Sequence, residues 1–216
     1  MKGIVELWQE CKGCLTMSEN QKDFKFDKRA ASYDDGFEGK FSQRFYRLLL
    51  SSIDLKPSYT VLDVGCGTGY LLRKMSEQQM IIGYGIDIEA NMIDKAKRTC
   101  PEMDIQTSPS EKTPFGNNTF DVMTACMAYH HFSDKEGFIK EAARILRTGG
   151  CLYIADPFFP FPVRKAINGV LKLFKVAGKF FTAKEMAADF SRFGFDFDCV
   201  IQKGIVQVVK LVKTGE

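Results

Sequence analysis

The hydrophobic residues of this chain alternate between two spacings, which predicts strands that alternate with helices along most of the sequence. Short apolar runs of the kind found in buried strands recur between residues 59 and 213. Five of them, separated by helical spacing, predict a mainly parallel sheet in three layers, and the last two, joined around Lys203-Gly204, predict an antiparallel hairpin. The expected strands are residues 59–64, 81–86, 103–107, 120–126, 151–156, 196–201 and 205–213.

Helical spacing predicts one helix before the first strand, over residues 41–49, another that begins at Leu71, and a third over residues 89–98. Ser133 with Glu136 has the spacing of a capping box, and the helix that it starts is expected to end at Gly149-Gly150. Residues 1–20 are expected to form an N-terminal extension, and residues 21–216 a single domain.

Composition narrows the class of protein. With 216 residues, 45% of them hydrophobic and 26% charged, the chain has the size and balance of one globular domain. No apolar run approaches the ~20 residues of a membrane span. Seven cysteines, an odd number, favour reduced thiols and a cytoplasmic location. Cys11-x-x-Cys14 lacks a second pair, so we expect free thiols and no metal site. A net charge of +3 is too weak to indicate nucleic-acid binding.

The segment with the most chemical information is the turn after the first strand, Val-Leu-Asp-Val-Gly-Cys-Gly-Thr-Gly-Tyr. Gly65, Gly67 and Gly69 are spaced one residue more tightly than the glycines of a dinucleotide-binding turn, and they let backbone approach a bulky ligand. Asp87 ends the second strand, 24 positions after Asp63, where a carboxylate can accept both hydroxyls of a ribose. The alternative is that Asp87 caps the following helix.

An ordered set of motifs around this turn resembles the class I S-adenosylmethionine-dependent methyltransferases, in the group that includes the ubiquinone/menaquinone-biosynthesis enzymes. The resemblance implies a three-layer Rossmann-like fold with a seven-stranded sheet, S-adenosyl-L-methionine as methyl donor and S-adenosyl-L-homocysteine as product. It implies in-line transfer to an O, N or C nucleophile of a small molecule. The motifs lie at residues 26–34, 65–69, 85–87, 113–115, 118–123, 129–132, 141–150 and 154–156.

The same resemblance implies the residues that bind the cofactor. The glycine turn and Asp63 would hold the methionine end, Asp87 the ribose, and Ile88 with Met92 the adenine. Relatives carry an aspartate before the Pro-Phe pair, but this chain has Pro109 there, so we expect Ser110 and Glu111 to replace it. The full set of expected cofactor-binding residues is Tyr33, Asp63, Gly65, Cys66, Gly67, Asp87, Ile88, Met92, Ser110, Glu111 and Cys126.

Candidate catalytic groups follow the fourth strand. His130 and His131 are the only histidines in the chain, and an imidazole with its usual pKa near 6.5 can take a proton from a hydroxyl group. The alternative is that one of them is buried and holds the loop backbone. Tyr129 and Tyr33 are candidates for shaping the methyl channel, or else are packing aromatics.

Two partial matches to nucleic-acid methyltransferases fail on detail. Asp156-Pro-Phe-Phe159 follows the fifth strand rather than the fourth and lacks a second proline, and Ala125-Cys126 is not the Pro-Cys of cytosine-C5 enzymes. Both differences argue against a nucleic-acid base as substrate. The alternatives to a small-molecule enzyme are an RNA or protein methyltransferase and a catalytically inactive S-adenosylmethionine-binding protein.

The segment 157–181 is the expected substrate lid. No acidic residue occurs from Pro157 to Lys184, and on a helix the lysines share one face and the residues Ile167, Val170, Leu171 and Phe174 another. This pattern fits a solvated surface helix with an apolar underside. It also fits peripheral membrane contact through residues 163–184. For the whole protein we expect a monomer or a homodimer.

Overall fold

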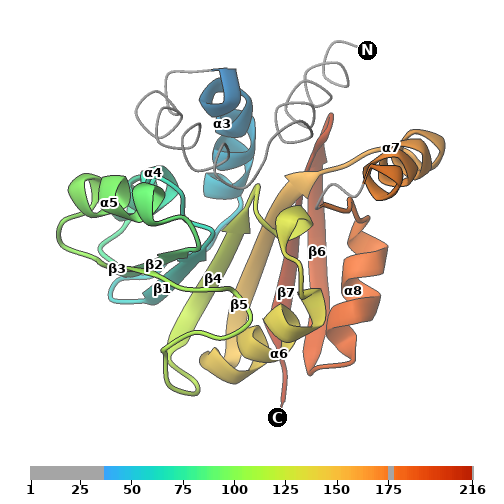
Figure 1. Cartoon of the computed structure of the whole chain (residues 1–216). Coiled ribbons are helices and arrows are strands. Elements are labelled where there is room, and N and C mark those ends of the chain that lie inside the picture. The colour runs from blue at the N-terminus through green and yellow to red at the C-terminus, as the bar shows by residue number, and fades with distance from the viewer. Residues whose placement is uncertain (1–36, 175–177, 216) are drawn as a thin grey trace.

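The computed structural model describes residues 37–174 and 178–215, with side chains from Phe41 onward. Helices and strands alternate along the chain as the apolar spacing predicts, and Figure 1 shows the sheet that they build. The helices are α3 (Phe37–Leu50), α4 (Tyr70–Gln78), α5 (Ala90–Thr99), the 3-10 turn η1 (Tyr129–His131), α6 (Lys135–Ile145), α7 (Phe161–Leu173) and α8 (Ala183–Ser191). The strands are β1 (Thr60–Val64), β2 (Ile82–Asp87), β3 (Asp104–Thr107), β4 (Phe120–Cys126), β5 (Leu146–Pro157), β6 (Phe195–Lys203) and β7 (Val206–Lys213).

The sheet has seven strands in the order β3-β2-β1-β4-β5-β7-β6, which confirms the predicted fold class. Strands β1 to β5 pair in parallel, and β7 pairs antiparallel with both β5 and β6. Parallel pairing brings the carboxyl ends of β1, β2, β4 and β5 to one edge. The chain order reverses between β1 and β4, and open α/β sheets bind ligands at the carboxyl edge beside such a reversal.

Alternate residues of the central strands supply two separate cores. On one face Val61 and Val122 pack with α3, α4 and α5, and on the other Leu62 and Met123 pack with α6 and α8. Figure 1 shows these helices on the two sides of the sheet. Because parallel strands are covered on both faces, nearly every position of β4 is apolar and buried.

Three local predictions are wrong. Asp134, and not Ser133, caps α6: its carboxylate accepts the Gly137 N–H at 2.8 Å. The helix ends at Ile145 rather than at the glycine pair, because β5 already begins at Leu146 to pair with Phe120.

The third wrong prediction concerns α7, whose residues Val170 and Phe174 were expected on the apolar underside. They are 38% and 60% exposed, and only Leu171 of the predicted face is buried. The expected N-terminal extension, with Cys11 and Cys14, lies outside the described residues.

Candidate functional site

The turn after β1 requires glycine at all three positions. Gly65, Gly67 and Gly69 have φ of 73°, 52° and 78°, a region that L side chains rarely adopt. A Cβ on Gly65 would lie 2.6 Å from the Ala128 Cβ, so this glycine lets the loop after β4 approach β1. A Cβ on Gly67 would meet no atom of the described residues within 4 Å. The backbone at Gly67 therefore borders open space at the sheet edge, as a ligand cradle does.

Asp87, at the end of β2, holds this turn. Its Oδ2 accepts the Gly67 N–H at 2.9 Å, and its Oδ1 accepts the Glu89 N–H at 3.0 Å. Burial raises the pKa of Asp87, although these backbone N–H groups oppose that effect. Glu89, not Asp87, is the N-cap residue of α5, so Asp87 supports the start of the helix from two residues before it. A carboxylate can accept about four hydrogen bonds, so Asp87 keeps acceptor capacity for a ligand beside these backbone groups.

Asp63 is a second carboxylate at the same edge and is 2% exposed. The Thr124 hydroxyl on β4 donates to its Oδ1 at 2.6 Å. Burial raises the pKa of Asp63 to about 7 against that hydrogen bond, and the charge of Asp87 adds to the rise. In the described part of the chain no lysine or arginine forms an ion pair with either carboxylate. This electrostatic arrangement fits a positively charged ligand.

The residues expected around an adenine flank Asp87. Ile88 is 71% exposed and Met92 is 8% exposed, and neither belongs to the two cores. Ser110 and Glu111 are both half-buried, and the Ser110 hydroxyl donates to Glu111 Oε2 at 3.1 Å. The serine thus engages the carboxylate that was expected to replace the missing aspartate.

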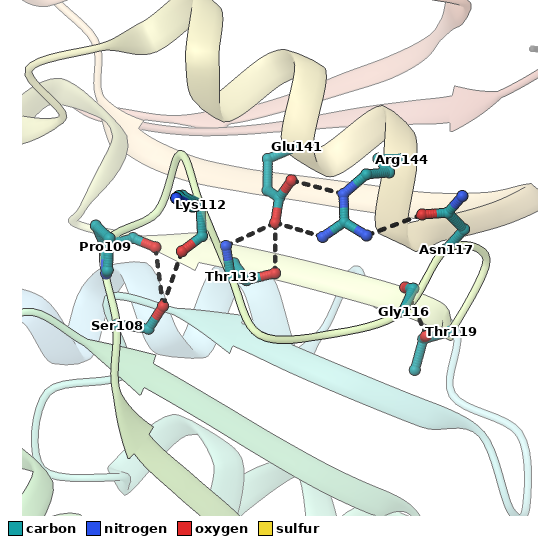
Figure 2. Close-up of polar contacts among 9 residues, drawn as sticks. All are labelled: Ser108, Pro109, Lys112, Thr113, Gly116, Asn117, Thr119, Glu141 and Arg144. Carbon is teal, nitrogen blue, oxygen red and sulfur yellow. Dashed lines mark hydrogen bonds and ion pairs between the residues drawn. The ribbon is translucent and has the colours of Figure 1, made fainter.

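The loop that carries Ser110 and Glu111 is fixed to α6, as Figure 2 shows. Glu141 Oε1 accepts both the N–H and the hydroxyl of Thr113 at 2.6 Å, and Arg144 donates to both oxygens of the same carboxylate. Burial opposes ionisation of Glu141, but these hydrogen bonds outweigh it and lower its pKa. At the other end of the loop, the Ser108 N–H donates to the Asp87 carbonyl at 3.0 Å. The loop is therefore held beside the ribose-binding candidate.

His130 forms a buried pair with Asp156 at the ends of β4 and β5. Asp156 Oδ2 accepts the His130 backbone N–H at 2.8 Å, and its Oδ1 lies 2.9 Å from His130 Nδ1. Because a carboxylate only accepts, this contact places the proton on Nδ1 and leaves Nε2 as the acceptor. The two residues are 4% and 2% exposed. Such a pair has the geometry of a general base with an orienting carboxylate.

The chain segment after α7 holds the imidazole in place. The Phe180 ring stacks on His130 with 5.1 Å between centroids, and the Lys179 N–H donates to the His130 carbonyl at 3.0 Å. Asn168 on α7 both donates to the Phe180 carbonyl and accepts its N–H, each at 3.0 Å. The Gln207 amide donates to the Phe181 carbonyl at 2.6 Å. Helix α7 is thus connected to His130 through one short segment.

His131 and Tyr129 differ from His130 in their surroundings. His131 keeps part of its surface exposed, and the His130 imidazole, followed by local desolvation and Lys135, lowers the pKa of His131 to about 3. Tyr129 is 0% exposed and packs in the core on the α6 side with Phe138 and other aromatic rings. Burial raises the pKa of its hydroxyl, which has no hydrogen-bond partner among the described residues. This placement favours the packing role.

Cys66 and Cys126 both lie at this edge and are 6% exposed. Burial, together with the charge of Asp63, raises the pKa of each thiol well above its usual value, so both stay neutral. Neither is suited to act as a nucleophile. The structure thus brings together the predicted set around Asp63, Gly67 and Asp87, while Tyr33 lies outside the described residues.

Sequence reasoning assigned no function to Asp156 and did not mention Asn168. The available signal for Asp156 was its position at the end of the fifth predicted strand, beside the end of the fourth, where the two histidines follow. Nothing in the sequence indicated a role for Asn168, because its hydrogen bonds with Phe180 depend on the path of the chain after α7.

Comparisons with known proteins identify relatives of this chain. Residues 62–154 match a family model described as "Methyltransferase domain". Demethylmenaquinone methyltransferase from Chlorobaculum parvum is 33% identical over 56% of this chain and 52% of its own length. Nocamycin O-methyltransferase from Saccharothrix syringae is 31% identical over 68% of this chain and 55% of its own length. The chain thus spans about half the length of these curated relatives.

The fold agrees with a solved structure as well. A SAM-dependent methyltransferase from Aquifex aeolicus superimposes with a TM-score of 0.64, at 21% identity, over 92% of this chain and 100% of that one. At this identity the likeness shows the fold alone. The match to residues 62–154, which contain the glycine turn, Asp63 and Asp87, thus identifies a methyltransferase domain in this chain, and the likeness of fold agrees with it.

Proposed function

We propose that this protein transfers a methyl group from S-adenosyl-L-methionine to a small-molecule nucleophile. The observation that carries the proposal is the pair of carboxylates, Asp63 and Asp87, beside the open space at Gly67 and without a cationic partner in the described residues. When bound, the cofactor supplies an activated methyl group on a positively charged sulfonium. Its ammonium and sulfonium groups are positively charged, so they would supply the cationic partner that the two carboxylates lack in the described residues.

In this proposal Asp87 accepts the ribose hydroxyls through its free lone pairs and keeps its bonds to Gly67 and Glu89. Asp63 and the carbonyls near Gly65 and Cys66 face the methionine ammonium. The exposed side chain of Ile88 and the edge of Met92 cover the adenine, with Ser110 and Glu111 as partners of its amino group.

The proton of an acceptor hydroxyl is taken by His130 Nε2. Asp156 holds the ring so that Nε2, rather than Nδ1, is the basic nitrogen, and it stabilises the imidazolium that forms. His131, with its pKa lowered to about 3, is poorly suited to take this proton. The main contribution of the fold is alignment of the methyl group with the nucleophile, which can contribute ~7–11 kcal/mol.

Helix α7 supports an apolar acceptor that reaches the site from an anionic lipid surface. Phe161, Leu173 and Phe174 are 69%, 76% and 60% exposed, which is unusual for one helix in water. Lys165 and Lys172 are exposed on the same helix and can attract anionic headgroups. Within the described residues no helix is long and apolar enough to cross a membrane, so the proposed contact is peripheral.

Titration calorimetry with S-adenosylmethionine tests the cofactor assignment. We expect binding to the wild-type protein and a Kd at least ~10-fold higher for Asp87→Ala, because hydrogen bonds to a charged group contribute ~1.5–3 kcal/mol. Glu102→Ala, an exposed carboxylate outside the site, is the matched control and should bind as wild type. No binding by the wild-type protein would refute the proposal.

The His130–Asp156 pair is tested after a screen with labelled cofactor against quinones, phenols, small amines and transfer RNA. A transfer-RNA product would favour the RNA-methyltransferase alternative, and cofactor binding without any product would favour an inactive binding protein. With an accepted hydroxyl substrate, Asp156→Asn should lower kcat ~100-fold with little change in the Kd for S-adenosylmethionine and should shift the pH profile of kcat. An unchanged pH profile of kcat would refute the role of His130 as the general base.

A further inference from the structure

A pocket lies between α3 and the turn that joins β6 to β7, with a volume of about 370 Å³. Leu48, Ile205 and Val206 form its apolar lining. This volume is within the range of sites that hold small molecules.

The polar lining of this pocket is cationic. Arg44 and Arg47 project from α3 and Lys203 from the end of β6, and all three side chains are exposed. Arg47 donates to the neutral Gln43 amide at 3.3 Å. None of the three forms an ion pair with a carboxylate anywhere in residues 37–174 and 178–215. Three like charges around one cavity repel one another, and an anion bound between them would relieve that repulsion.

The pocket lies near the candidate active site but uses different residues. Val206 pairs with Pro157, and the Ile205 carbonyl accepts the Phe158 N–H at 2.7 Å. The turn is thereby joined to the chain immediately after Asp156, at the carboxyl edge of β5. Neither Asp63 nor Asp87, the carboxylates of the proposed cofactor site, lines it.

We propose that this pocket binds a small ligand with an anionic end, a phosphate or a carboxylate, and a short apolar body. The guanidinium groups of Arg44 and Arg47 can donate paired hydrogen bonds to such an oxyanion, and Lys203 adds a charge from the opposite wall. The apolar body packs on Leu48 and Val206. The proposal does not rest on the methyl-transfer function.

Calorimetric titration with octyl phosphate tests the site, with inorganic phosphate and 1-octanol as the probes for each half of the ligand. We expect octyl phosphate to bind at least ~10-fold more tightly than either, because each contributes only one of the two kinds of contact. The double variant Arg44→Gln with Lys203→Gln should weaken octyl phosphate at least ~10-fold. Both positions are exposed, so the fold should survive, and circular dichroism checks it.

The matched control is Lys97→Gln with Arg98→Gln, which removes the same charge from exposed positions on α5. It should bind octyl phosphate as the wild-type protein does. If the control variant bound octyl phosphate as weakly as the Arg44/Lys203 variant does, net charge alone would attract the probe. If 1-octanol bound to the wild-type protein as tightly as octyl phosphate does, the three cations would not contribute to binding. Either result would overturn the proposed site. Calorimetry with S-adenosylmethionine on the same variants should be unchanged, so failure here is distinguishable from failure of the proposed cofactor site.

Discussion

Replacing Gly67 by alanine should separate cofactor binding from stability at the turn after β1. Gly65 and Gly67 both have positive φ, so alanine at either position costs ~1–2 kcal/mol of backbone strain. At Gly65 the new Cβ would also lie 2.6 Å from the Ala128 Cβ, and such overpacking costs a further ~1–3 kcal/mol. At Gly67 the new Cβ meets no atom within 4 Å in the part of the chain that the structure describes.

The free energy of unfolding should therefore fall by about 2–5 kcal/mol in Gly65→Ala but by only about 1–2 kcal/mol in Gly67→Ala. The Gly67 Cβ would instead intrude on the proposed cofactor. A steric cost of about 1–3 kcal/mol raises the Kd for S-adenosylmethionine by ~5–150-fold.

Urea unfolding and calorimetry on the two variants check these values, and Gly204→Ala serves as the control. Gly204 also has a positive φ, and a Cβ there meets no atom of residues 41–174 and 178–215 within 4 Å, yet it lies in the β6–β7 turn. It should lose stability like Gly67→Ala and bind S-adenosylmethionine like the wild-type protein. Wild-type affinity in Gly67→Ala would refute the cradle, and equal stability of the Gly65 and Gly67 variants would refute the role of the Ala128 contact.

Two further predictions concern charge. Because burial raises the pKa of Asp63 to about 7, the folded protein holds a proton that the unfolded chain releases above pH ~4. The free energy of unfolding should thus fall as pH rises from about 4 to 7, and Asp63→Asn should flatten this slope in denaturant titrations; an equal slope in the variant would show that another group titrates. For α7, Lys165→Glu with Lys172→Glu should abolish sedimentation with vesicles rich in phosphatidylglycerol, and Leu173→Ser should weaken it. Vesicles of phosphatidylcholine are the control, and unchanged sedimentation of both variants would exclude α7 as the contact.

Strand positions were predictable here because a parallel sheet covered on both faces needs continuous apolar runs. The prediction for β4 matches its observed bounds, and β1 to β3 begin one residue later than expected. The early start of β5 was not predictable, because it depends on pairing of Leu146 with Phe120 across the sheet rather than on local sequence. Aspartate is a common helix cap, so the Asp134 cap could have been predicted from the local sequence. The prediction chose Ser133 because Ser133 and Glu136 have the spacing of a capping box.

In the candidate site, too, some residues could be predicted from the sequence and others could not. Asp63, Gly67 and Asp87 were predictable because two strand ends and one turn, read in order, place them together. The His130–Asp156 pair needed the register of β4 against β5, which no single stretch of sequence encodes. For α7 the sequence left two interpretations open, a helix with an apolar underside and a membrane contact, because helical spacing identifies a hydrophobic face without showing what covers it.

The two hydrogen bonds between Asn168 and Phe180 make α7 and the His130 ring mechanically dependent on each other. If α7 swings outward, it either breaks both bonds, at a cost of ~1 kcal/mol each, or pulls Phe180 off the imidazole that it covers. In the second case the imidazole loses the ring that covers it and gains contact with water. The position of α7 and the solvation of the His130 ring are therefore coupled through Phe180, although no residue of α7 needs to touch the histidine itself.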